Sequence, residues 1–444
     1  MKRAIHLSFL ASIIVVNSMA ADDLASMFKE GKASGQVRAF YIDRDYSGGT
    51  TVHRDGLTIG GYLKYETGVF NGLSAGAAFY TTNKLDSKSS IAGENDTTLF
   101  GPNGENETYL GEAYLQYKNG NTAFKAGRQK LDTPLAGSDD ARMLPNLFEA
   151  YVLSNTDIKD TTLVAAHVTK FAAGTFANAY NYTSGTGNVL ALTSGYSGVT
   201  NATSMVGQFT DMGEYAIGKN TSGVTVAAAI YSGIPGLKLQ LWDYYAHDIL
   251  NAIYADANYG WSYKSGVAPY VAAQYIKEDN IGSDYAGNVN SDFLAAKAGV
   301  KVANFDVYGA VSHNSKDSSA TINGGTITPW GGMPAYTQGM VTRHQFMAGT
   351  DALKAAASYD WKDFGVNLNT GVYYTSFEMD ALNGYVADHS WTATESGFDV
   401  TYNPQAVKNL QLRLRGNFPR DSKESAAGVG TDWDEYRVIA NYNF

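Results

Sequence analysis

The chain ends on the stretch DEYRVIANYNF, residues 434–444, in which apolar and polar side chains alternate. The apolar side carries Tyr436, Val438, Ala440, Tyr442 and Phe444. The polar side carries Glu435, Arg437, Asn441 and Asn443, with Ile439 as its one apolar member. Alternation with a period of two residues is typical of a β-strand whose two faces meet different surroundings. The stretch therefore predicts a strand with one apolar and one polar face.

The same alternation recurs along the chain in segments of about ten residues, the length of a strand that crosses a membrane. Two examples are LTIGGYLKYET, residues 57–67, and NLQLRLRGNF, residues 409–418. Such strands have two interpretations. In a soluble sandwich the apolar face packs on a second sheet, and in a membrane barrel it contacts lipid.

Connection lengths decide between these two architectures. The eight short turns are 70–72, 118–121, 157–160, 234–236, 264–266, 303–304, 362–363 and 403–408. The nine long or polar loops are 44–55, 82–107, 131–147, 172–222, 246–249, 278–290, 314–350, 379–392 and 418–432. Short and long connections alternate, which is the pattern of short periplasmic turns and long outer loops. We therefore predict an all-β fold, a transmembrane antiparallel β-barrel of 18 strands. Residues 212–218 could form one more strand, but it would break the even number, so we assign them to the fourth loop.

The N-terminus has the features of a secretory signal peptide. Lys2 and Arg3 precede an apolar run, residues 5–16, and small residues follow it up to Ala21. This order of basic, apolar and small residues is that of an exported protein, and the run is too short to span a bilayer as a helix. We expect a signal peptide over residues 1–20, with cleavage after Ala20 or Ala21.

After the signal we expect a short periplasmic segment, residues 21–34, and then the barrel, residues 35–444. Leu24, Met27 and Phe28 have the i, i+3, i+4 spacing of an apolar helix face. The terminal aromatic Phe444 resembles the C-terminal recognition pattern of outer-membrane proteins. That resemblance implies contact between the last strand and the barrel-assembly machinery.

Composition excludes several classes of function. The chain has 33 Lys+Arg and 43 Asp+Glu, so without Lys2 and Arg3 the mature chain is acidic by 12 charges (43 less 31). An acidic chain argues against nucleic acid as a partner. With zero cysteines there are neither disulfides nor thiolate metal sites. The histidines follow no repeated metal spacing and no catalytic set stands out. We therefore expect no enzyme activity, no metal and no cofactor.

Basic residues concentrate on the polar faces of the last and first strands. Arg413, Arg415 and Arg437 belong to the last two strands, and Arg38 and Lys64 to the first two. Because closure places the first strand beside the last, these residues would form one basic wall in the lumen. They are either ordinary polar lining or a solute path, since charges of one sign focus the field of a channel and arginine can bind a carboxylate bidentately. Three lysines share the inward parity on distant strands: Lys297, Lys301 and Lys354.

The stretch AGRQKLDTPLAGSDDARMLPNLFEAY, residues 126–151, is unusually rich in charge and proline. It contains the third long loop, residues 131–147, with Pro134, Pro145, Asp132, Asp139, Asp140 and Arg142. A barrel of 18 strands is too wide to discriminate small solutes unless something folds inward. We predict that this loop folds into the lumen opposite the basic wall and forms the constriction. A calcium site at Asp139 and Asp140, with Asp132 and Asn146, is an alternative that the sequence leaves open.

Residues 127–150, GRQKLDTPLAGSDDARMLPNLFEA, resemble the third loop of OprD-type outer-membrane porins. The shared pattern is a Gly-Arg-Gln, a Pro, an Asp-x-Arg and a Leu-Pro-x-x-Phe-Glu. The start, LASMFKEGKASGQVRAFYID, residues 24–43, resembles a short helix leading into the first strand of the same family. The resemblance implies an 18-stranded porin for small nutrients, often with carboxylates, and assigns four residues to the constriction: Arg128, Asp140, Arg142 and Pro145. Strict alternation places Arg128 toward lipid, so either a bulge at Gly127 turns it inward or it lies above the membrane at the rim, and we expect the bulge.

The sequence thus predicts a passive, cofactor-free porin in the outer membrane of a Gram-negative bacterium, in contact with lipid and lipopolysaccharide. Small hydrophilic solutes and ions would be its cargo. Two alternatives remain open: a general, weakly selective trimeric porin, and a surface barrel plugged by residues 172–222. Substrate, ion preference and oligomeric state are not determined by the sequence.

Overall fold

The computed structural model describes residues 22–49, 51–85, 94–101, 104–182, 189–199 and 203–444. The expected signal peptide lies outside these residues. Twenty strands form one sheet, of which two are short additions, β8 (Phe209–Asp211) and β19 (Lys423–Glu424), leaving 18 long strands. These are β1 (Lys32–Gly48), β2 (Val52–Glu66), β3 (Leu73–Lys84), β4 (Glu107–Asn119), β5 (Thr122–Gln129), β6 (Leu147–Asn155), β7 (Thr161–Ala172), β9 (Val224–Tyr231), β10 (Leu237–Ala246), β11 (Leu250–Gly260), β12 (Ala268–Asp279), β13 (Asn290–Val302), β14 (Phe305–Asn314), β15 (Asp351–Asp360), β16 (Leu368–Met379), β17 (Trp391–Tyr402), β18 (Leu410–Arg420) and β20 (Gly430–Asn443).

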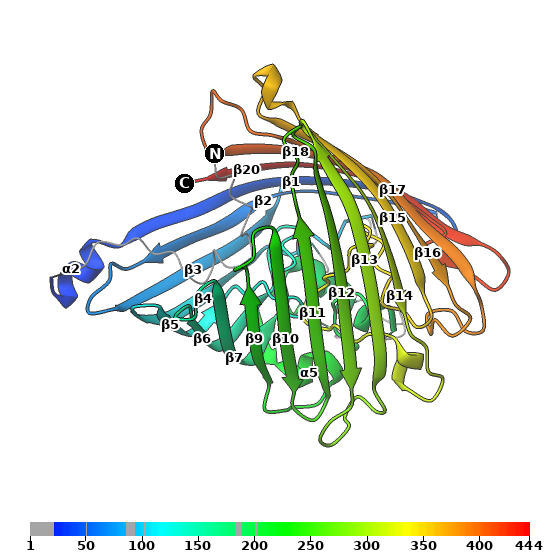
Figure 1. Ribbon diagram of the computed structural model, residues 1–444, viewed down its shortest axis with the longest axis horizontal. Coiled ribbons are helices and arrows are strands. Elements are labelled where there is room, and N and C mark those ends of the chain that lie inside the picture. The colour runs from blue at the N-terminus through cyan, green and yellow to red at the C-terminus, as the bar shows by residue number, and fades with distance from the viewer. Residues whose placement is uncertain (1–21, 50, 86–93, 102–103, 183–188, 200–202) are drawn as a thin grey trace.

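The long strands pair antiparallel in chain order, and β1 also pairs with β20, which closes the sheet (Figure 1). At this seam the Gly35 amide donates to the Phe444 carbonyl at 2.9 Å, and the Phe444 amide donates to the Gly35 carbonyl at 3.1 Å. A closed barrel leaves no unpaired strand edge, as a lipid environment requires. The predicted 18-stranded antiparallel barrel is confirmed.

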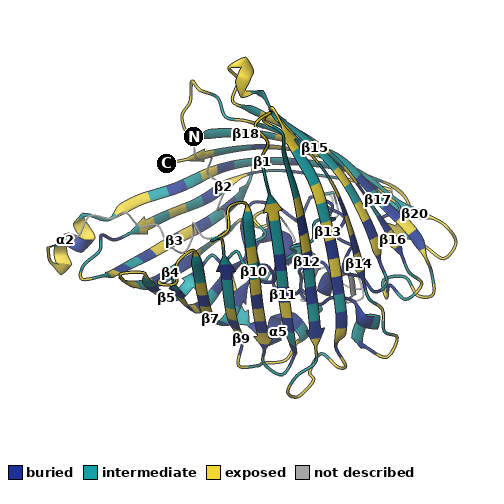
Figure 2. Ribbon diagram, in the orientation of Figure 1, coloured by how far each residue is buried: buried dark blue, intermediate teal, exposed yellow. Residues whose placement is uncertain are grey.

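The two faces of the wall differ as the alternation predicts. Along β20, Val438 is 53 % exposed on the outer face, whereas its neighbour Arg437 is 0 % exposed on the inner face. The same alternation of exposed and buried residues runs along most strands (Figure 2). Apolar side chains therefore form the outer surface of the barrel, and polar and charged side chains point inward.

The eight predicted short turns all separate the strands as expected, but the first long loop does not exist as predicted. Strands β1 and β2 pair in register as far as Tyr46 and Val52, so residues 44–48 and 52–55 of the predicted loop belong to the strands of a long hairpin. The charged residues of this segment indicated a loop, but they lie on strands that continue as an extended hairpin. Polarity alone does not end a strand where both neighbouring strands continue the ladder.

Helices are few and short. They are α2 (Leu24–Lys29), α3 (Thr175–Tyr182), α4 (Val189–Leu192), α5 (Met212–Ile217), and the 3-10 turns η1 (Thr321–Gly324) and η2 (Trp361–Phe364). The predicted short helix before the first strand is α2, and residues 212–218 belong to the fourth loop, where α5 forms. None of the helices in the described ranges is long and apolar enough to cross a membrane.

Three long loops fold into the barrel and supply its internal core. The third loop (residues 130–146), the fourth loop (173–223) and the seventh loop (315–350) join inward-facing wall residues in one apolar cluster. Its members include Leu135, Tyr196, Trp330 and the wall residue Tyr244. The sequence predicted inward folding of the third loop and gave the fourth only as the plug of an alternative barrel, because neither the fourth nor the seventh loop has a comparable concentration of charge and proline.

Candidate functional site: the third loop and the lumen wall

The third loop crosses the lumen and is attached on both sides. On one side, the Leu135 amide donates to the Tyr244 hydroxyl of β10 at 3.3 Å, and the Gly137 amide donates to the Trp330 carbonyl of the seventh loop at 2.9 Å. On the other side, Leu144 packs among inward-facing residues of β1 and β20, including Phe40. The loop therefore bridges the barrel from β10 to the β1–β20 seam.

Asp140 joins the third loop to the basic wall. Its carboxylate lies 2.7 Å from Nη1 of Arg38 on β1 and 3.4 Å from Nζ of Lys130. Arg38 also donates to the Arg142 carbonyl and, at 2.9 Å, to Asn441 on β20. Burial by itself raises the pKa of Asp140, but the charges of Arg38 and Lys130 outweigh it and hold this pKa below its ordinary value of 3.8. The acid of the loop is thus bound directly to the wall and does not face it across open water.

Asp139 points away from the basic wall and ties three loops together. Its carboxylate accepts two bonds from Arg343 of the seventh loop, at 2.9 and 3.2 Å. It also accepts a bond at 2.8 Å from the Tyr196 hydroxyl of the fourth loop. A bidentate arginine–carboxylate pair fixes both distance and orientation. Asp139 and Asp140 therefore serve opposite sides of the third loop.

Arg142 and Arg437 are buried together around a single carboxylate. Glu435 on β20 lies 3.4 Å from Nη2 of Arg142, 2.7 Å from Nε of Arg44, and within hydrogen-bond reach of Arg437. Asp96 of the second loop (residues 85–106) pairs with Arg44 at 3.2 Å. Arg142 is 1 % and Arg437 0 % exposed. Burial, and next the charge of Arg437, lower the pKa of Arg142 to about 9. The structure thus buries Arg437, which was predicted on the open wall, and Arg142, which was predicted in the constriction loop, and both hold the third loop to β20.

Arg413 and Arg415 remain in contact with the lumen. Both bind Asp399 on β17, Arg413 through Nε at 2.7 Å and Arg415 through Nε at 2.9 Å. The Arg413 side chain is 31 % and the Arg415 side chain 14 % exposed. Across the seam, Lys64 on β2 lies 3.3 Å from Glu112 and 3.5 Å from Glu66. Of the predicted wall, Arg413 and Arg415 keep excess positive charge, whereas Lys64 is balanced by two acids.

Asp132 and Pro145 shape the loop and lie apart from the charge clusters. Asp132 accepts the Ser138 amide at 3.0 Å and closes the tip of the loop. Pro145 is buried where the chain returns to β6, next to Gly174. Because Asp132, Asp139 and Asp140 each bind a different partner, their carboxylates do not converge as calcium ligands would.

Arg128 does not turn inward, and the expected bulge at Gly127 is wrong. Strand β5 pairs in register with β4 and β6 through Gly127, with Arg128 opposite Glu149. Arg128 shares the outward parity of Phe124, pairs with Glu149 at 3.8 Å and lies 4.2 Å from the Phe209 ring. Gly127 adopts a φ of 122°, a conformation that glycine accommodates while the pairing continues. Arg128 therefore lies on the outside of the wall at the end of β5.

Among the described residues, one group of side chains brings potential metal-ligand atoms within 4.8 Å of one another: Asp43, Asp45 and His53. It lies on the outer face near the turn of the β1–β2 hairpin. Nδ1 of His53 faces Asp45 at 2.7 Å and Nε2 faces Asp43 at 3.6 Å. The imidazole thus lies between the two carboxylates, with a hydrogen bond to Asp45 and a longer ion contact to Asp43.

The seventh loop was missed by the sequence analysis as part of the site. Its backbone amides at Met340 and Thr342 donate to Glu395 on β17, a side chain that is 0 % exposed. Gln338 accepts a bond at 2.6 Å from Lys354 on β15. The one available signal was length, because a connection from 315 to 350 exceeds an ordinary loop and such loops are usually functional.

Residues 26–444 of the chain match the family model described as outer membrane porin, OprD family. The chain belongs to the OprD family. The OprD-type barrel is accordingly an outer-membrane porin, a channel and not an enzyme, through which small solutes pass.

Solved structures from Pseudomonas aeruginosa share the fold of this OprD-family chain. OpdK, determined with vanillate, has a TM-score of 0.74 at 16 % identity and covers 94 % of this chain and 99 % of its own. OccK9 (OpdG) has a TM-score of 0.74 at 18 % identity with the same coverage. OccK2 (OpdF), in complex with glucuronate, has a TM-score of 0.72 at 17 % identity, again with 94 % and 99 % covered. The comparison with curated protein sequences found no match.

Proposed function

We propose that this porin favours small hydrophilic solutes that carry a carboxylate. One observation carries the proposal: two arginines of the lumen wall, Arg413 and Arg415, share the single carboxylate of Asp399. The group keeps one net positive charge and partly exposed guanidinium groups. A solute carboxylate can replace part of the bonding that Asp399 gives them, because arginine presents several N–H donors in a planar fork.

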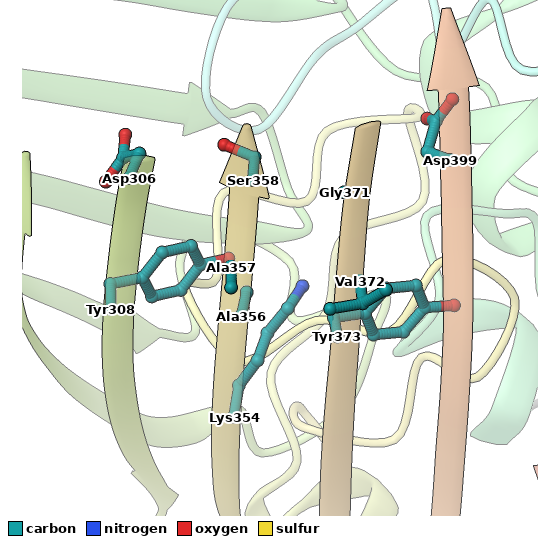
Figure 3. A pocket seen from close by; sticks show the side chains of 10 residues that line it. All are labelled: Asp306, Tyr308, Lys354, Ala356, Ala357, Ser358, Gly371, Val372, Tyr373 and Asp399. Carbon is teal, nitrogen blue, oxygen red and sulfur yellow. The ribbon is translucent and has the colours of Figure 1, made fainter. Parts of the chain in front are cut away.

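Asp399 also lies in a row of neighbouring residues, several of them charged, that crosses the inner wall from strand to strand. Strand register places Arg437, Arg415 and Asp399 side by side on β20, β18 and β17. The row continues through Gly371 and Ser358 to Asp306 on β14. Between Asp399 and Asp306 the small residues leave a hollow of about 190 Å³ (Figure 3). A solute released by the arginines thus finds a polar recess beside them.

Polar groups of the recess suit hydroxyl-bearing solutes. The Lys354 ammonium points between the Tyr308 and Tyr373 rings (Figure 3) and lies 5.1 Å from the Tyr373 ring centroid. Ligand sites combine apolar walls with a few placed polar groups, and closed ones are usually larger than this recess. The recess therefore supports brief contact during passage better than tight binding.

A second group of shared charge lies where the third loop meets the wall. Asp140 is bound by Arg38 and Lys130, so this group also keeps one net positive charge. The Lys130 and Asp140 side chains are each 32 % exposed. Two separate groups of excess positive charge favour anions in a channel despite the acidic composition of the whole chain. The solved neighbours with vanillate and with glucuronate contain carboxylate compounds, which supports the same solute class.

We also propose roles for the N-terminal segment, the third loop and the outer surface of the barrel. Residues 1–20 act as a cleaved export signal, residues 21–34 form the N-terminal segment at the periplasmic end of the barrel, and the third loop forms the constriction. The outer face contacts lipopolysaccharide, and the C-terminal strand ending at Phe444 engages the barrel-assembly machinery. The carboxylate path lies within a single barrel, so it requires no particular oligomeric state.

Single-channel conductance in planar bilayers tests the solute class. The expected result is discrete steps that millimolar glucuronate or benzoate partly blocks, with the block weakened in the double variant Arg413→Ala, Arg415→Ala. The matched control is Lys297→Ala with Lys301→Ala, which removes the same charge from β13 and should retain the block.

The other outcomes separate the remaining functions. Large steps that neither carboxylates nor the arginine variant affect would indicate a general porin. Equal weakening in both double variants would show that net charge, and not the Arg413–Arg415 group, governs the block. An absence of steps from folded protein would favour a barrel plugged by its inward loops, of which the fourth contributes Phe176, Tyr196 and Met212 to the internal core.

A further inference from the structure

The short N-terminal helix α2 lies on the outer side of the barrel at its periplasmic end. The Tyr65 hydroxyl of β2 donates to the Phe28 carbonyl, and the Gly68 amide donates to the Met27 carbonyl at 2.8 Å. Tyr65 belongs to the outward face of β2, where it is 38 % exposed. Figure 1 shows α2 beyond the ends of β2 and β3, at the far edge of the molecule. The helix thus packs against the lipid-facing side of the wall and does not enter the lumen.

Close approach at Gly31 and Gly68 fixes this position. A Cβ at Gly31 would meet the Tyr65 hydroxyl at 2.0 Å, so only glycine allows the chain to pass the ring. A Cβ at Gly68 would meet the Met27 carbonyl at 3.2 Å. Met27 is 3 % exposed, whereas the rest of the helix faces outward. The helix is therefore attached through one side chain and its backbone.

The outward side of α2 is apolar. Leu24 is 58 % and Phe28 56 % exposed, and they stand four residues apart, on one face of the helix. Asp23 caps the helix through the Ser26 amide at 2.6 Å, and Lys29 and Lys32 follow the apolar pair. An exposed apolar face that continues an established lipid surface indicates contact with the same lipid. That surface continues above α2 with Leu63, 54 % exposed, and Phe79, 57 % exposed.

We propose that α2 is an interfacial anchor that inserts Leu24 and Phe28 into the periplasmic leaflet of the outer membrane. The occupant of its apolar face is the headgroup–acyl boundary of phospholipid. Tyr65 is part of the aromatic belt at this depth, because tyrosine places its ring in the apolar layer and its hydroxyl at the polar boundary. Lys29 and Lys32 extend toward lipid phosphates. The anchor leads directly into β1, and so holds the strand that closes the barrel against β20.

The absence of cysteine makes the depth of α2 directly measurable. A nitroxide label at Phe28→Cys would be placed in the full-length barrel, in vesicles of phosphatidylethanolamine and phosphatidylglycerol. Power-saturation EPR then compares its accessibility to oxygen and to a nickel chelate. Val438→Cys, on the outer face of β20, is the control for the hydrocarbon core. Lys408→Cys, exposed in the β17–β18 turn, is the control for water.

The expected result is a label at position 28 with an oxygen-to-nickel ratio between the two controls, several-fold above that of Lys408→Cys. A ratio equal to that of Lys408→Cys would overturn the proposal. Spin–spin broadening that disappears on dilution with unlabelled protein would assign the face to a second copy and would also overturn it.

The variant Tyr65→Phe tests whether lipid or the barrel wall holds helix α2 in its position. It removes the hydroxyl bond to Phe28 without removing the ring. If lipid holds the helix, the depth at position 28 stays between the controls. If the label then becomes as accessible as Lys408→Cys, the wall contact alone held the helix, and the proposal fails.

Discussion

Single carboxylates organise the charges of this lumen. Asp399 forms ion pairs with Arg413 and Arg415, and Asp140 forms ion pairs with Arg38 and Lys130. Glu435 forms ion pairs with three arginines. Their surroundings give them different roles. The Asp399 and Asp140 groups have exposed side chains and can exchange partners with a solute. The Glu435 group is closed to solvent, so its bonds serve to hold the structure.

Replacing Asp399 with Asn should increase the preference of the channel for carboxylates. Without that charge, both guanidinium groups lose their common partner while remaining in place. A charge removed from a partly screened wall changes ion energies by about 1 kcal/mol, which is roughly a five-fold change in the block by glucuronate. Conductance titrations with glucuronate measure it.

The matched control is Asp306→Asn, in the same row of the wall, where the carboxylate pairs with Lys301 at 3.4 Å. It changes net charge equally, so a similar gain in this variant would contradict a specific role for the Arg413–Arg415 pair.

Replacing Glu435 with Gln should destabilise the barrel. Arg44, Arg142 and Arg437 would then share a buried site without the carboxylate, and two nitrogens of Arg437 already lack a hydrogen-bond partner among the described residues. Removing one partner of a buried charge cluster costs about 3–5 kcal/mol. Unfolding by guanidinium in detergent micelles should show this loss.

Asp434→Asn provides the comparison on the same strand. Asp434 pairs with Arg420 at 2.7 Å on the surface, with both side chains nearly half exposed. An exposed pair contributes about 0–1 kcal/mol. Equal stability of the two variants would show that the Glu435 cluster does not hold the third loop.

At the scale of elements, the third loop is the part whose inward folding the sequence predicted, but the sequence placed it opposite the basic wall and the structure binds it to that wall. Its proline and charge content indicated inward folding. Its partners come from β1, β10 and two other loops, which are far away in sequence and have no common pattern. For the β1–β2 hairpin the local prediction itself was wrong, because polarity indicated a loop where continuous pairing extends the strands.

The third loop should remain attached to the wall down to low pH. The pKa of Asp140 is held below its ordinary value of 3.8, so the bonds to Arg38 and Lys130 are complete above that pH. They are lost as pH falls through the lower pKa of the folded protein. Closures of single channels should therefore stay constant from pH 7 to about pH 4 and become more frequent below it.

In Asp140→Asn the closures should be roughly five-fold more frequent than in the unmodified protein above about pH 4, since a partly exposed charged bond contributes about 1 kcal/mol, and this difference should disappear at lower pH. Asp284→Asn, in the sixth loop, where the carboxylate accepts a bond from Asn280 at 2.8 Å, should behave as the unmodified protein. More frequent closures already at pH 6 in the unmodified protein would contradict this account.

At the scale of the whole molecule, closure of the sheet is the property on which every site depends. The seam joins the two ends of the described chain, and its last bonds are those between Gly35 and Phe444. Because each of the 18 long strands is paired on both sides, losing the seam exposes two edges at once.

Deleting Phe444 should reduce assembly more than it reduces the stability of barrels that do assemble. The deletion removes two seam bonds, each contributing about 1 kcal/mol, from a ladder that continues to Thr431. The fraction of protein that migrates as folded barrel without heating should fall in membrane preparations. Tyr442→Ala, which keeps chain length and seam pairing, is the control, and an equal loss in that variant would assign the effect to the aromatic surface.

The sequence by itself determined the barrel, its 18 strands, the direction of its faces and the family, because alternation and loop length are local properties that each segment carries. Only the tertiary structure decided which charges meet. Arg437 has the same residue type and inward position as Arg413, and Arg142 belongs to the charged loop, yet burial around Glu435 makes both of them supports of the third loop. The seventh loop and Arg343 entered the site through contacts across the lumen. Such contacts depend on how separate loops pack together inside the barrel, and the alternation of residues along one strand does not predict that packing.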